Sequence, residues 1–404
     1  MSHAARLAAL ESLLLAHQPL WQAQPFKQAR PDWCAEYPEL AAALLALDEA
    51  QLARLSQDEA ALWAVLAAHL PSLAELSELC RLPLLPGGAL SDPGPHFANH
   101  IPGRKWQQIQ AFSAALGPGQ GPWLEWCGGK GHLGRLLCWQ HGQSVTTLER
   151  DAALCEDGER LARRSGIPQR FERLDVLTPA ASLQLPGRHA LALHACGELH
   201  RQLLREGVTR GMAALDLAPC CYHHLQQGDY QPFSPQARLR LRRDDLRLAV
   251  TGAATAPARE LRRRDQEMAW KLGYLALRGQ LPGEGYKALR SIDKSWLRGD
   301  FAAFCRQLAA REGDVLPAEP GCEPDWATLE RLGWQRQHET MRLSLLRQGF
   351  RRAIELWLVH DMACYLEAHG YQVRVGEFCA SALSPRNLLL SARRETKLSI
   401  GTYH

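Results

Sequence analysis

The chain of 404 residues has a composition close to the average of soluble globular proteins, with 46% hydrophobic and 22% charged residues. A chain of this length has room for two or three domains, and this composition excludes a mainly disordered or fibrous protein. The net charge is only +4, so any attraction to nucleic acid must come from local clusters of basic residues.

The 12 cysteines do not indicate a secreted, disulfide-bonded protein. Disulfide frameworks belong mostly to short secreted chains, whereas this chain is long and begins without the cationic and apolar regions of a signal peptide. No uninterrupted apolar stretch reaches the roughly 18 residues that a membrane span needs. We therefore expect a soluble protein of the reducing cytoplasm, with no membrane partner.

Residues 1–95 predict an α-helical N-terminal domain. Leucines recur at three- and four-residue spacing, as at Leu7, Leu10 and Leu14, and this is the period of an amphipathic helix. Prolines divide the segment into short helices, and the stretch 86–95, rich in proline and glycine, predicts a domain boundary. The pattern is that of helical packing and points to no chemistry.

Residues 96–235 change to an alternation of short strands and helices. Strands are predicted at 123–127, 144–149, 170–176, 190–195 and 213–218, with helices between them, for example at 151–164 and 199–207. This alternation is typical of βαβ units, which build a parallel sheet covered on both faces. Ligands of such sheets bind at the carboxyl ends of the strands.

Residues 236–340 predict an arginine-rich, mainly helical insertion, because strand patterns return only near the C-terminus. Residues 341–404 contain a long amphipathic helix and strand patterns at 371–375 and 387–391. We expect this last segment to complete the sheet that begins in residues 96–235.

The most informative run is Glu-Trp-Cys-Gly-Gly-Lys-Gly-His-Leu-Gly at 125–134, directly after the first predicted strand. Its glycines permit a tight turn and a close approach of a ligand to the backbone, and the following helix presents free N–H groups. The run is not a P-loop, because no serine or threonine follows Lys130. A dinucleotide site is an alternative, because residues 129–134 match G-x-G-x-x-G, but that match alone is a weak signal.

Acidic residues near the ends of the first three strands favour S-adenosylmethionine (SAM) over a dinucleotide. Glu125 can accept a hydrogen bond from the ammonium group of SAM, Glu149 can hold both ribose hydroxyls, and Asp175 can bind the adenine amino group. Each acid alone could be a strand-end or helix-capping residue. Three of them at successive strand ends around a glycine turn are hard to explain as caps.

Three motifs together carry a family resemblance: Cys-Gly-Gly-Lys-Gly-His-Leu-Gly at 127–134, His-Ala-Cys-Gly-Glu-Leu at 194–199 and Ala-Pro-Cys-Cys-Tyr-His at 218–223. With them the chain resembles a group of class I SAM-dependent methyltransferases that includes uncharacterised bacterial proteins and the methyltransferase part of the eukaryotic glutathione S-transferase C-terminal domain-containing protein. It is more distantly similar to eukaryotic tRNA ribose 2′-O-methyltransferases of the acceptor stem. The resemblance covers about residues 100–235 and the region 384–387.

The resemblance implies an α/β fold: a Rossmann-like, seven-stranded SAM-dependent methyltransferase sheet, preceded by the α-helical N-terminal domain and interrupted by a helical insertion before the last strands. It also implies SAM as the cofactor. The predicted cofactor-binding residues are Glu125, Cys127, Gly128, Gly129, Gly131, Glu149, Asp175, Val176 and His194.

Cysteines and histidines gather after the fourth and fifth predicted strands, and three interpretations of the cysteines compete. Buried free cysteine often serves only as a small apolar residue. A zinc site is disfavoured, because the adjacent Cys220 and Cys221 lack the usual ligand spacing, and we predict no metal ligand. Cys220 could instead be a nucleophile, because residues 218–220 resemble the Ala/Pro/Cys element of RNA cytosine-C5 methyltransferases. In those enzymes, however, the element follows the fourth strand, whereas here it follows the fifth predicted strand.

Without a covalent step, the reaction is direct displacement at the sulfonium, which needs positioning and the removal of one proton. Histidine and tyrosine side chains at the same strand ends can orient the substrate or accept that proton. The predicted catalytic residues are His194, Cys220, Tyr222 and His223.

Arginines near the start of the insertion predict the substrate. Arg238, Arg240, Arg242 and Arg243 can lie on one face of an extended segment and neutralise phosphates, although nearby acids are also typical of a solvated surface. We expect RNA and not DNA, with tRNA favoured, because no aromatic stacking platform for single strands is visible. A protein or small-molecule methyltransferase, and a non-catalytic SAM-binding module, are the alternatives.

Overall fold

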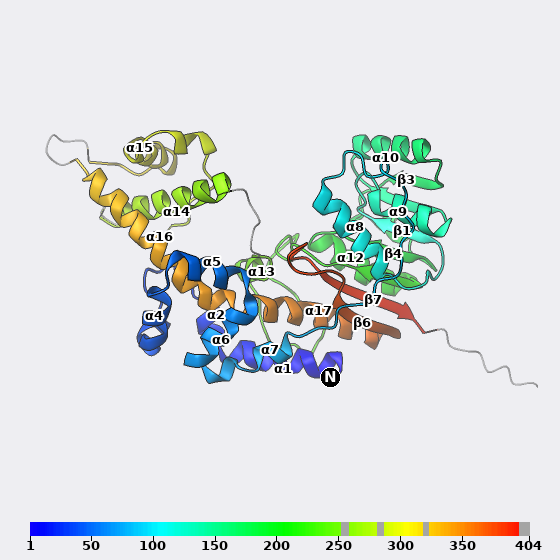
Figure 1. Ribbon diagram of the computed structural model, residues 1–404, viewed down its shortest axis with the longest axis horizontal. Coiled ribbons are helices and arrows are strands. Elements are labelled where there is room, and N and C mark those ends of the chain that lie inside the picture. Colours follow the sequence, from blue (N-terminus) through cyan, green and yellow to red (C-terminus); the bar gives the residue numbers. More distant parts are fainter. Residues whose placement is uncertain (252–257, 281–286, 318–322, 396–404) are drawn as a thin grey trace, which may run out of the picture. The chain divides into compact units, whose positions relative to one another are not determined.

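The computed structural model describes residues 1–251, 258–280, 287–317 and 323–395 (Figure 1). The chain forms two compact units. Unit 1 comprises Met1–Ala16, Leu76–Gly252 and Arg351–His404, and unit 2 comprises His17–Glu75 and Ala253–Phe350. Parts of the predicted insertion, at 252–257, 281–286 and 318–322, and the end of the predicted C-terminal segment, at 396–404, lie outside the described residues. None of the described helices combines the length and the apolar character that crossing a membrane requires.

Unit 1 is built on a seven-stranded sheet with the strand order β3-β2-β1-β4-β5-β7-β6. Strands β1 to β5 pair in parallel, and β7 runs antiparallel to both β5 and β6. The Rossmann-like, seven-stranded sheet expected from the sequence is confirmed. The strands are β1 (Trp123–Trp126), β2 (Val145–Glu149), β3 (Gln169–Arg173), β4 (His189–Ala192), β5 (Ala214–Leu217), β6 (Tyr371–Glu377) and β7 (Leu388–Arg394).

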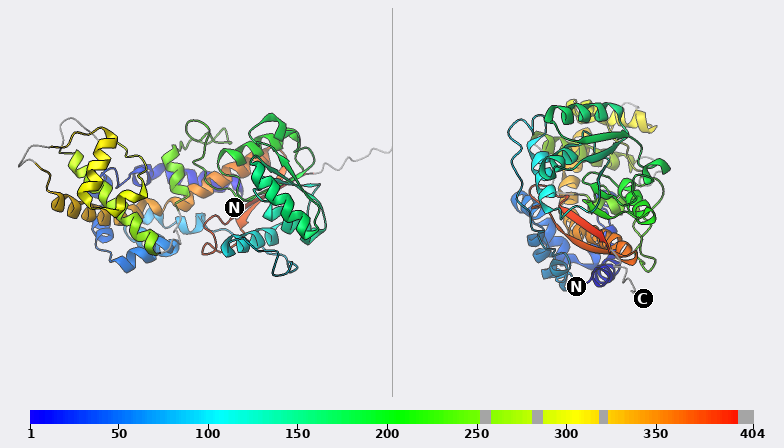
Figure 2. Two further views of the ribbon diagram at one scale, coloured as in Figure 1. Left: turned by 90° about the horizontal axis from the view of Figure 1, so that it is seen from above. Right: turned by 90° about the vertical axis from the view of Figure 1, so that its right-hand side faces the viewer.

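Helices cover both faces of this sheet (Figure 2). The chain moves from β1 to β2 and from β4 to β5 in opposite directions across the sheet. Because crossovers between parallel strands are right-handed, the helices of these two connections lie on opposite faces. Strands β1, β4 and β5 are buried throughout as a result. The helices are α8 (Gly103–Ala115), α9 (His132–His141), α10 (Ala152–Ser165), α11 (Pro179–Ser182), α12 (Glu198–Arg210), α13 (Arg243–Ala249) and α17 (Arg351–Ala368).

The first helix of the chain, α1 (His3–Ala16), belongs to unit 1, as does α7 (Leu76–Leu79). Helix α1 packs along α17, and the buried Glu11 carboxylate accepts hydrogen bonds from the backbone N–H groups of Arg238 (2.9 Å) and Leu239 (3.1 Å). The backbone of Leu85 donates to Glu377 O at 2.7 Å. Helix α1 and the chain that follows α7 are thereby attached to the rest of unit 1.

Unit 2 is helical. Its long helix α16 packs against α14 and against the shorter α2, α4 and α5. A Cβ atom at Gly333 would lie 2.3 Å from Ala269 O, so glycine at this position permits the close approach of α16 to α14. The elements are α2 (Gln18–Gln22), α3 (Trp33–Glu36), α4 (Pro38–Leu45), α5 (Glu49–Gln57), α6 (Glu59–His69), η1 (Pro71–Leu73), α14 (Ala258–Arg278), η2 (Lys294–Arg298), α15 (Phe301–Glu312) and α16 (Trp326–Gln348).

The two units differ from the four consecutive segments that the sequence predicts. Residues 17–75 group with 253–350, and the stretch 86–95 lies inside unit 1 and does not separate units. Short helices bury their apolar faces only against partners, and here those partners are distant in the sequence. Helical periodicity reveals which face is buried but not which helix covers it.

A buried charged cluster in the middle of the sheet generates a stability prediction. Asp216 on β5 lies 2.7 Å from His189 Nε2 and accepts a hydrogen bond from Arg393 Nη2 at 2.8 Å. Replacing Asp216 with alanine leaves the partly buried arginine without its carboxylate. We expect Asp216→Ala to lower the free energy of unfolding by about 3–5 kcal/mol, measured by urea denaturation followed by tryptophan fluorescence.

Asp157→Ala is the matched control, because Asp157 forms only partly exposed ion pairs with Lys130 and Arg160. Such surface pairs contribute about 0–1 kcal/mol. Equal losses of unfolding free energy in Asp216→Ala and Asp157→Ala would contradict a stabilising role of the buried cluster.

Candidate cofactor and substrate site

The turn after β1 has the backbone geometry of a ligand-binding loop. Cys127, Gly129 and Gly131 all have positive φ, at 57°, 59° and 65°, and Gly131 is the residue that precedes α9. A left-handed conformation is uncommon outside glycine, so Cys127 is held there by its surroundings. The turn exposes backbone and aims the N-terminus of α9 across the carboxyl edge of the sheet.

Glu125 lies beneath this turn in a buried hydrogen-bond network. Its Oε2 accepts a hydrogen bond from Thr147 Oγ1 at 2.8 Å, and Gln169 Nε2 donates to Thr147 Oγ1 and to Gly131 O, each at 2.9 Å. A Cβ atom at Gly128 would lie 2.4 Å from Thr147 Cγ2 and 2.6 Å from Glu125 Cδ. Gly128 is therefore required by close packing over the carboxyl group. Burial raises the pKa of Glu125 to about 7, although the Thr147 hydrogen bond opposes this shift.

Glu149, at the end of β2, is oriented by the turn itself. Its carboxylate accepts hydrogen bonds from Gly129 N and Asp151 N, each at 3.0 Å. Each carboxylate oxygen has a second lone pair, so the group can still accept from a diol. Asp175 follows β3, where its Oδ1 accepts from Leu177 N at 3.0 Å, and Val176 between them is buried. The structure therefore places the three predicted acids in β1, at the end of β2 and after β3.

A small cavity of about 30 Å³ lies beside the turn at the ends of β1 and β4. Four predicted cofactor residues line it, namely Glu125, Cys127, Gly128 and His194, together with Lys105 of α8. The loss of hydration and the nearby Lys105 ammonium lower the pKa of His194. Lys105 carries no local sequence signal, because only the fold brings α8 to this edge.

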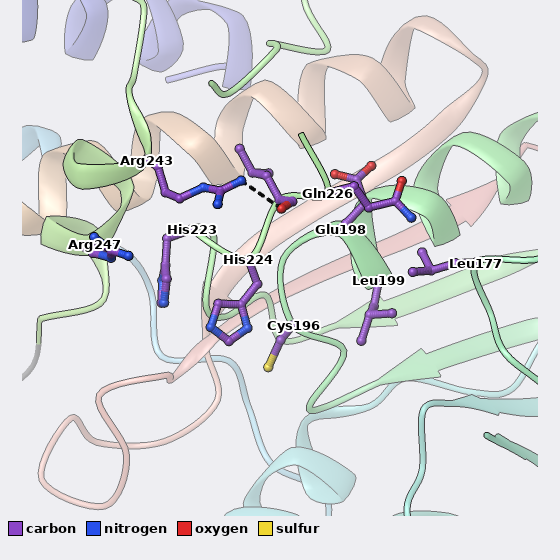
Figure 3. A pocket seen from close by; sticks show the side chains of 10 residues that line it. Leu177, Cys196, Glu198, Leu199, His223, His224, Gln226, Arg243 and Arg247 are labelled. Atoms are coloured by element: carbon purple, nitrogen blue, oxygen red, sulfur yellow. Dashed lines mark hydrogen bonds between the residues drawn. The ribbon is translucent and has the colours of Figure 1, made fainter. Parts of the chain in front are cut away.

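A larger pocket of about 490 Å³ opens where β4 and β5 end (Figure 3). Its wall extends from Leu177, which follows Asp175, to Arg243 and Arg247 on α13. The pocket therefore adjoins the predicted nucleoside site at one end and carries two cationic side chains at the other. The residues that line it are Leu177, Cys196, Glu198, Leu199, His223, His224, Leu225, Gln226, Arg243 and Arg247.

His223 is the predicted catalytic residue that faces this pocket. Its ring lies edge-on to His224, with the ring centroids 4.3 Å apart, and its Nδ1 is buried without a hydrogen-bond partner in the described part of the chain. Burial, followed by the charge of His224, lowers the pKa of His223. A neutral imidazole at neutral pH can accept a proton from a bound substrate.

The structure does not support Tyr222 and Cys220 as direct participants. Tyr222 is only 1% exposed, and burial raises its pKa well above the usual range. Cys220 is 5% exposed and is not among the residues that line the pocket, whereas Cys196, whose Sγ lies 3.3 Å from that of Cys220, does line it. The interactions with the thiols of Cys196 and Cys221 raise the pKa of Cys220. A buried, protonated thiol is a poor nucleophile, and this argues against the cytosine-C5 mechanism at this residue.

Of the four arginines predicted to bind substrate, only Arg243 lines the pocket. Its Nη2 donates to Leu225 O at 3.0 Å. Arg238 pairs with Glu11 at 3.5 Å, Arg242 pairs with Asp245 at 3.2 Å, and Arg240 donates to Ala237 O at 3.1 Å. These three remain exposed while Leu239 and Leu241 between them are fully buried, so the expected alternation occurs without a strand.

Arg247 is a pocket residue that was not among the predicted site residues. It lies four positions after Arg243, and on a helix such positions share a face. The sequence did not predict the helix α13, because the alternation of arginine and leucine that precedes it suggests an extended chain. Without that helix, Arg247 could not be placed beside Arg243.

Residues 104–228 match a family model described as a methyltransferase domain. Two solved structures show similarity to the chain at 11% identity each. The cyclopropane synthase MmaA2 from Mycobacterium tuberculosis covers 88% of this chain and 96% of its own, with a TM-score of 0.24. Coclaurine N-methyltransferase bound to N-methylheliamine and SAH covers 97% and 94%, with a TM-score of 0.26. The comparison with curated proteins found no significant match.

The packing over Glu125 generates a prediction about the turn. Gly128→Ala must displace both Thr147 and the Glu125 carboxyl group, or shift the turn itself, because the added methyl group overlaps both side chains. We expect the dissociation constant for SAM to rise at least about tenfold, which corresponds to about 1.4 kcal/mol, in isothermal titration calorimetry. Gly103→Ala is the control, because a Cβ atom there would meet nothing within 4 Å. Unchanged SAM affinity in Gly128→Ala would contradict the placement of the cofactor on this turn.

Proposed function

We propose that this protein, a SAM-dependent methyltransferase, methylates an RNA whose target group enters the larger pocket and whose phosphates contact Arg243 and Arg247. The methyltransferase class follows from the domain match over residues 104–228, and the Rossmann-like sheet with its acidic strand ends agrees with SAM as the methyl donor. The observation that carries the substrate proposal is the pocket at the ends of β4 and β5, with histidine and arginine side chains in one wall.

The cofactor residues have distinct tasks in this proposal. SAM supplies an electrophilic methyl group on a sulfonium. Glu149 accepts from the ribose hydroxyls, Asp175 binds the adenine amino group, and Glu125 accepts from the ammonium group. Lys105, which lines the same small cavity as Glu125, is placed to attract the carboxylate of the cofactor.

The chemistry expected of the chain is positioning and proton removal. A hydroxyl or ring nitrogen of the substrate loses a proton as it gains the methyl group, and His223 can accept that proton because its lowered pKa leaves the imidazole neutral at neutral pH. A pocket of about 490 Å³ falls within the range of small-molecule sites. It can hold one nucleotide unit, with the rest of the substrate outside.

The arginines favour a phosphate-bearing substrate. The planar guanidinium group matches phosphate oxygens in pairs and keeps its charge at all relevant pH values. Glu198 in the same pocket is an acid, but its carboxylate pairs with Arg205 at 2.6 Å. Among the described residues that line the pocket there is no phenylalanine, tyrosine or tryptophan, so a structured RNA such as tRNA, bound through shape and backbone, is the substrate that we favour. A small anionic molecule would occupy the same pocket but would not reach Arg238, Arg240 and Arg242, which are exposed outside it.

Charge reversal at the pocket tests the substrate. With Arg243→Glu or Arg247→Glu, we expect the kcat/KM for methylation of unmodified tRNA to fall at least about tenfold, in an assay with radiolabelled SAM, while SAM affinity stays unchanged. Arg374→Glu is the matched control, because Arg374 is exposed on the edge strand β6. Equal activity in all three variants, or methylation of peptides or small acids with no activity on RNA, would contradict the RNA proposal.

The pKa of Glu125 gives a test of its contact with the ammonium group. Without SAM the carboxyl group titrates near pH 7, so it is mostly protonated at pH 5.5. If the ammonium group stabilises the carboxylate, SAM binding releases a proton, and its dissociation constant falls as the pH rises from about 5.5 to 7. Calorimetry in buffers of different ionisation enthalpy measures this proton. Glu125→Gln should remove the pH dependence, and identical pH profiles for the two proteins would contradict the contact.

A further inference from the structure

We propose that Cys196, Cys220 and Cys221 bind a thiophilic metal ion, Zn²⁺ in the first instance, in the wall of the larger pocket. Their three Sγ atoms all lie within 4.8 Å of one another, and those of Cys196 and Cys220 are 3.3 Å apart. The three residues come from the loops that follow β4 and β5. Three thiols this close are the ligand set that selects zinc or copper(I) over hard cations such as Mg²⁺.

The sequence-based objection to such a site is the adjacency of Cys220 and Cys221, because neighbouring side chains of an extended chain point in opposite directions. The structure removes this objection. Cys221 adopts a φ of +45°, and this left-handed turn brings its thiol to the same side as that of Cys220. A non-glycine residue in this region costs free energy, and strained residues of this kind cluster at functional sites.

Backbone hydrogen bonds hold the two loops together around the thiols. Cys196 and Cys220 form an isolated parallel bridge, and Gly197 N donates to Cys220 O at 3.0 Å. The N–H of His224 donates to Cys221 O at 2.9 Å, and that of Glu198 donates to His224 O at 2.8 Å. The ligand geometry is therefore set by the main chain, so little ordering of the loops would accompany binding.

The dimensions fit a zinc ion. Zinc–sulfur bonds of about 2.3 Å in a tetrahedron place sulfur atoms about 3.8 Å apart. This distance lies between the Cys196–Cys220 sulfur separation of 3.3 Å and the 4.8 Å within which all three sulfur atoms lie. Three protein ligands leave a fourth position for water or a substrate atom, as in catalytic zinc sites. Cys196 lines the pocket, so the ion would lie beside the bound substrate. The Arg386 guanidinium, whose charge acts on Cys221, would offset the net negative charge of a zinc ion bound to three thiolates.

Metal binding is testable without reference to activity. Untagged, full-length protein is reduced, freed of metal with a chelator and titrated anaerobically with Zn²⁺ against a chromophoric competitor, and then with Co²⁺. We expect one equivalent of Zn²⁺ and an intense thiolate-to-cobalt charge-transfer absorption. Cys196→Ser and Cys221→Ser should each weaken Zn²⁺ binding at least about tenfold, whereas the control Cys364→Ser, a cysteine on α17 outside the cluster, should still bind one equivalent.

A second measurement uses only the wild-type protein, in case the serine variants unfold. Zn²⁺ should slow alkylation of Cys196 and Cys221 by iodoacetamide but not that of Cys364, as read by mass spectrometry of the peptides. The proposal is overturned if the reduced protein binds no Zn²⁺ at micromolar concentration. Zn²⁺ stoichiometry and affinity unchanged in Cys196→Ser and Cys221→Ser, or equal alkylation with and without Zn²⁺, would overturn it as well. A Cys196–Cys220 disulfide whose thiols do not bind Zn²⁺ after reduction would also overturn the proposal.

Discussion

The cofactor edge of the protein depends on a buried hydrogen-bond network under the turn after β1. Thr147 donates to Glu125, and Gln169 joins Thr147 to the carbonyl oxygen of Gly131, so side chains from β1, β2 and β3 are tied to the turn that we expect to face the cofactor. The same turn donates from Gly129 N to Glu149. Because these groups constrain one another, the turn, Glu125 and Glu149 form one preorganised unit. The free energy of cofactor binding then need not be spent on ordering them.

The larger pocket follows from the topology of the sheet. Parallel strands β4 and β5 end at the same edge as β1, so their loops bring His223, His224 and Cys196 next to the end of the cofactor site. Helix α13 then adds Arg243 and Arg247. The acids expected to bind the cofactor, the histidines and the cationic side chains are thereby brought together from separate segments of the chain. The three thiols belong to the same loops. A metal ion bound by them would fix the positions of these loops and thereby the shape of the pocket wall that they form.

The sequence allowed prediction of the elements whose signals are local. The short strands, the glycine turn at 127–131 and the acids at 125, 149 and 175 could be read from periodicity and spacing, because each depends on its own neighbours. Lys105 and Arg247 could not, since their place at the site depends on how α8 and α13 pack. The ion pairs of Arg238 and Arg242 could not be predicted for a related reason: their acidic partners, Glu11 and Asp245, become visible only in the folded chain. The grouping of residues 17–75 with 253–350 likewise depends on contacts between distant helices.

A crystal structure of the full chain with SAH would test the cofactor placement directly. We expect the ribose hydroxyls on Glu149, the adenine next to Asp175 and Val176, and the amino acid portion beside Glu125 and Lys105, with the sulfur directed toward the pocket lined by Cys196 and His223. SAH bound away from the turn at 127–131, or with its sulfur directed away from that pocket, would contradict the proposed arrangement of methyl donor and substrate.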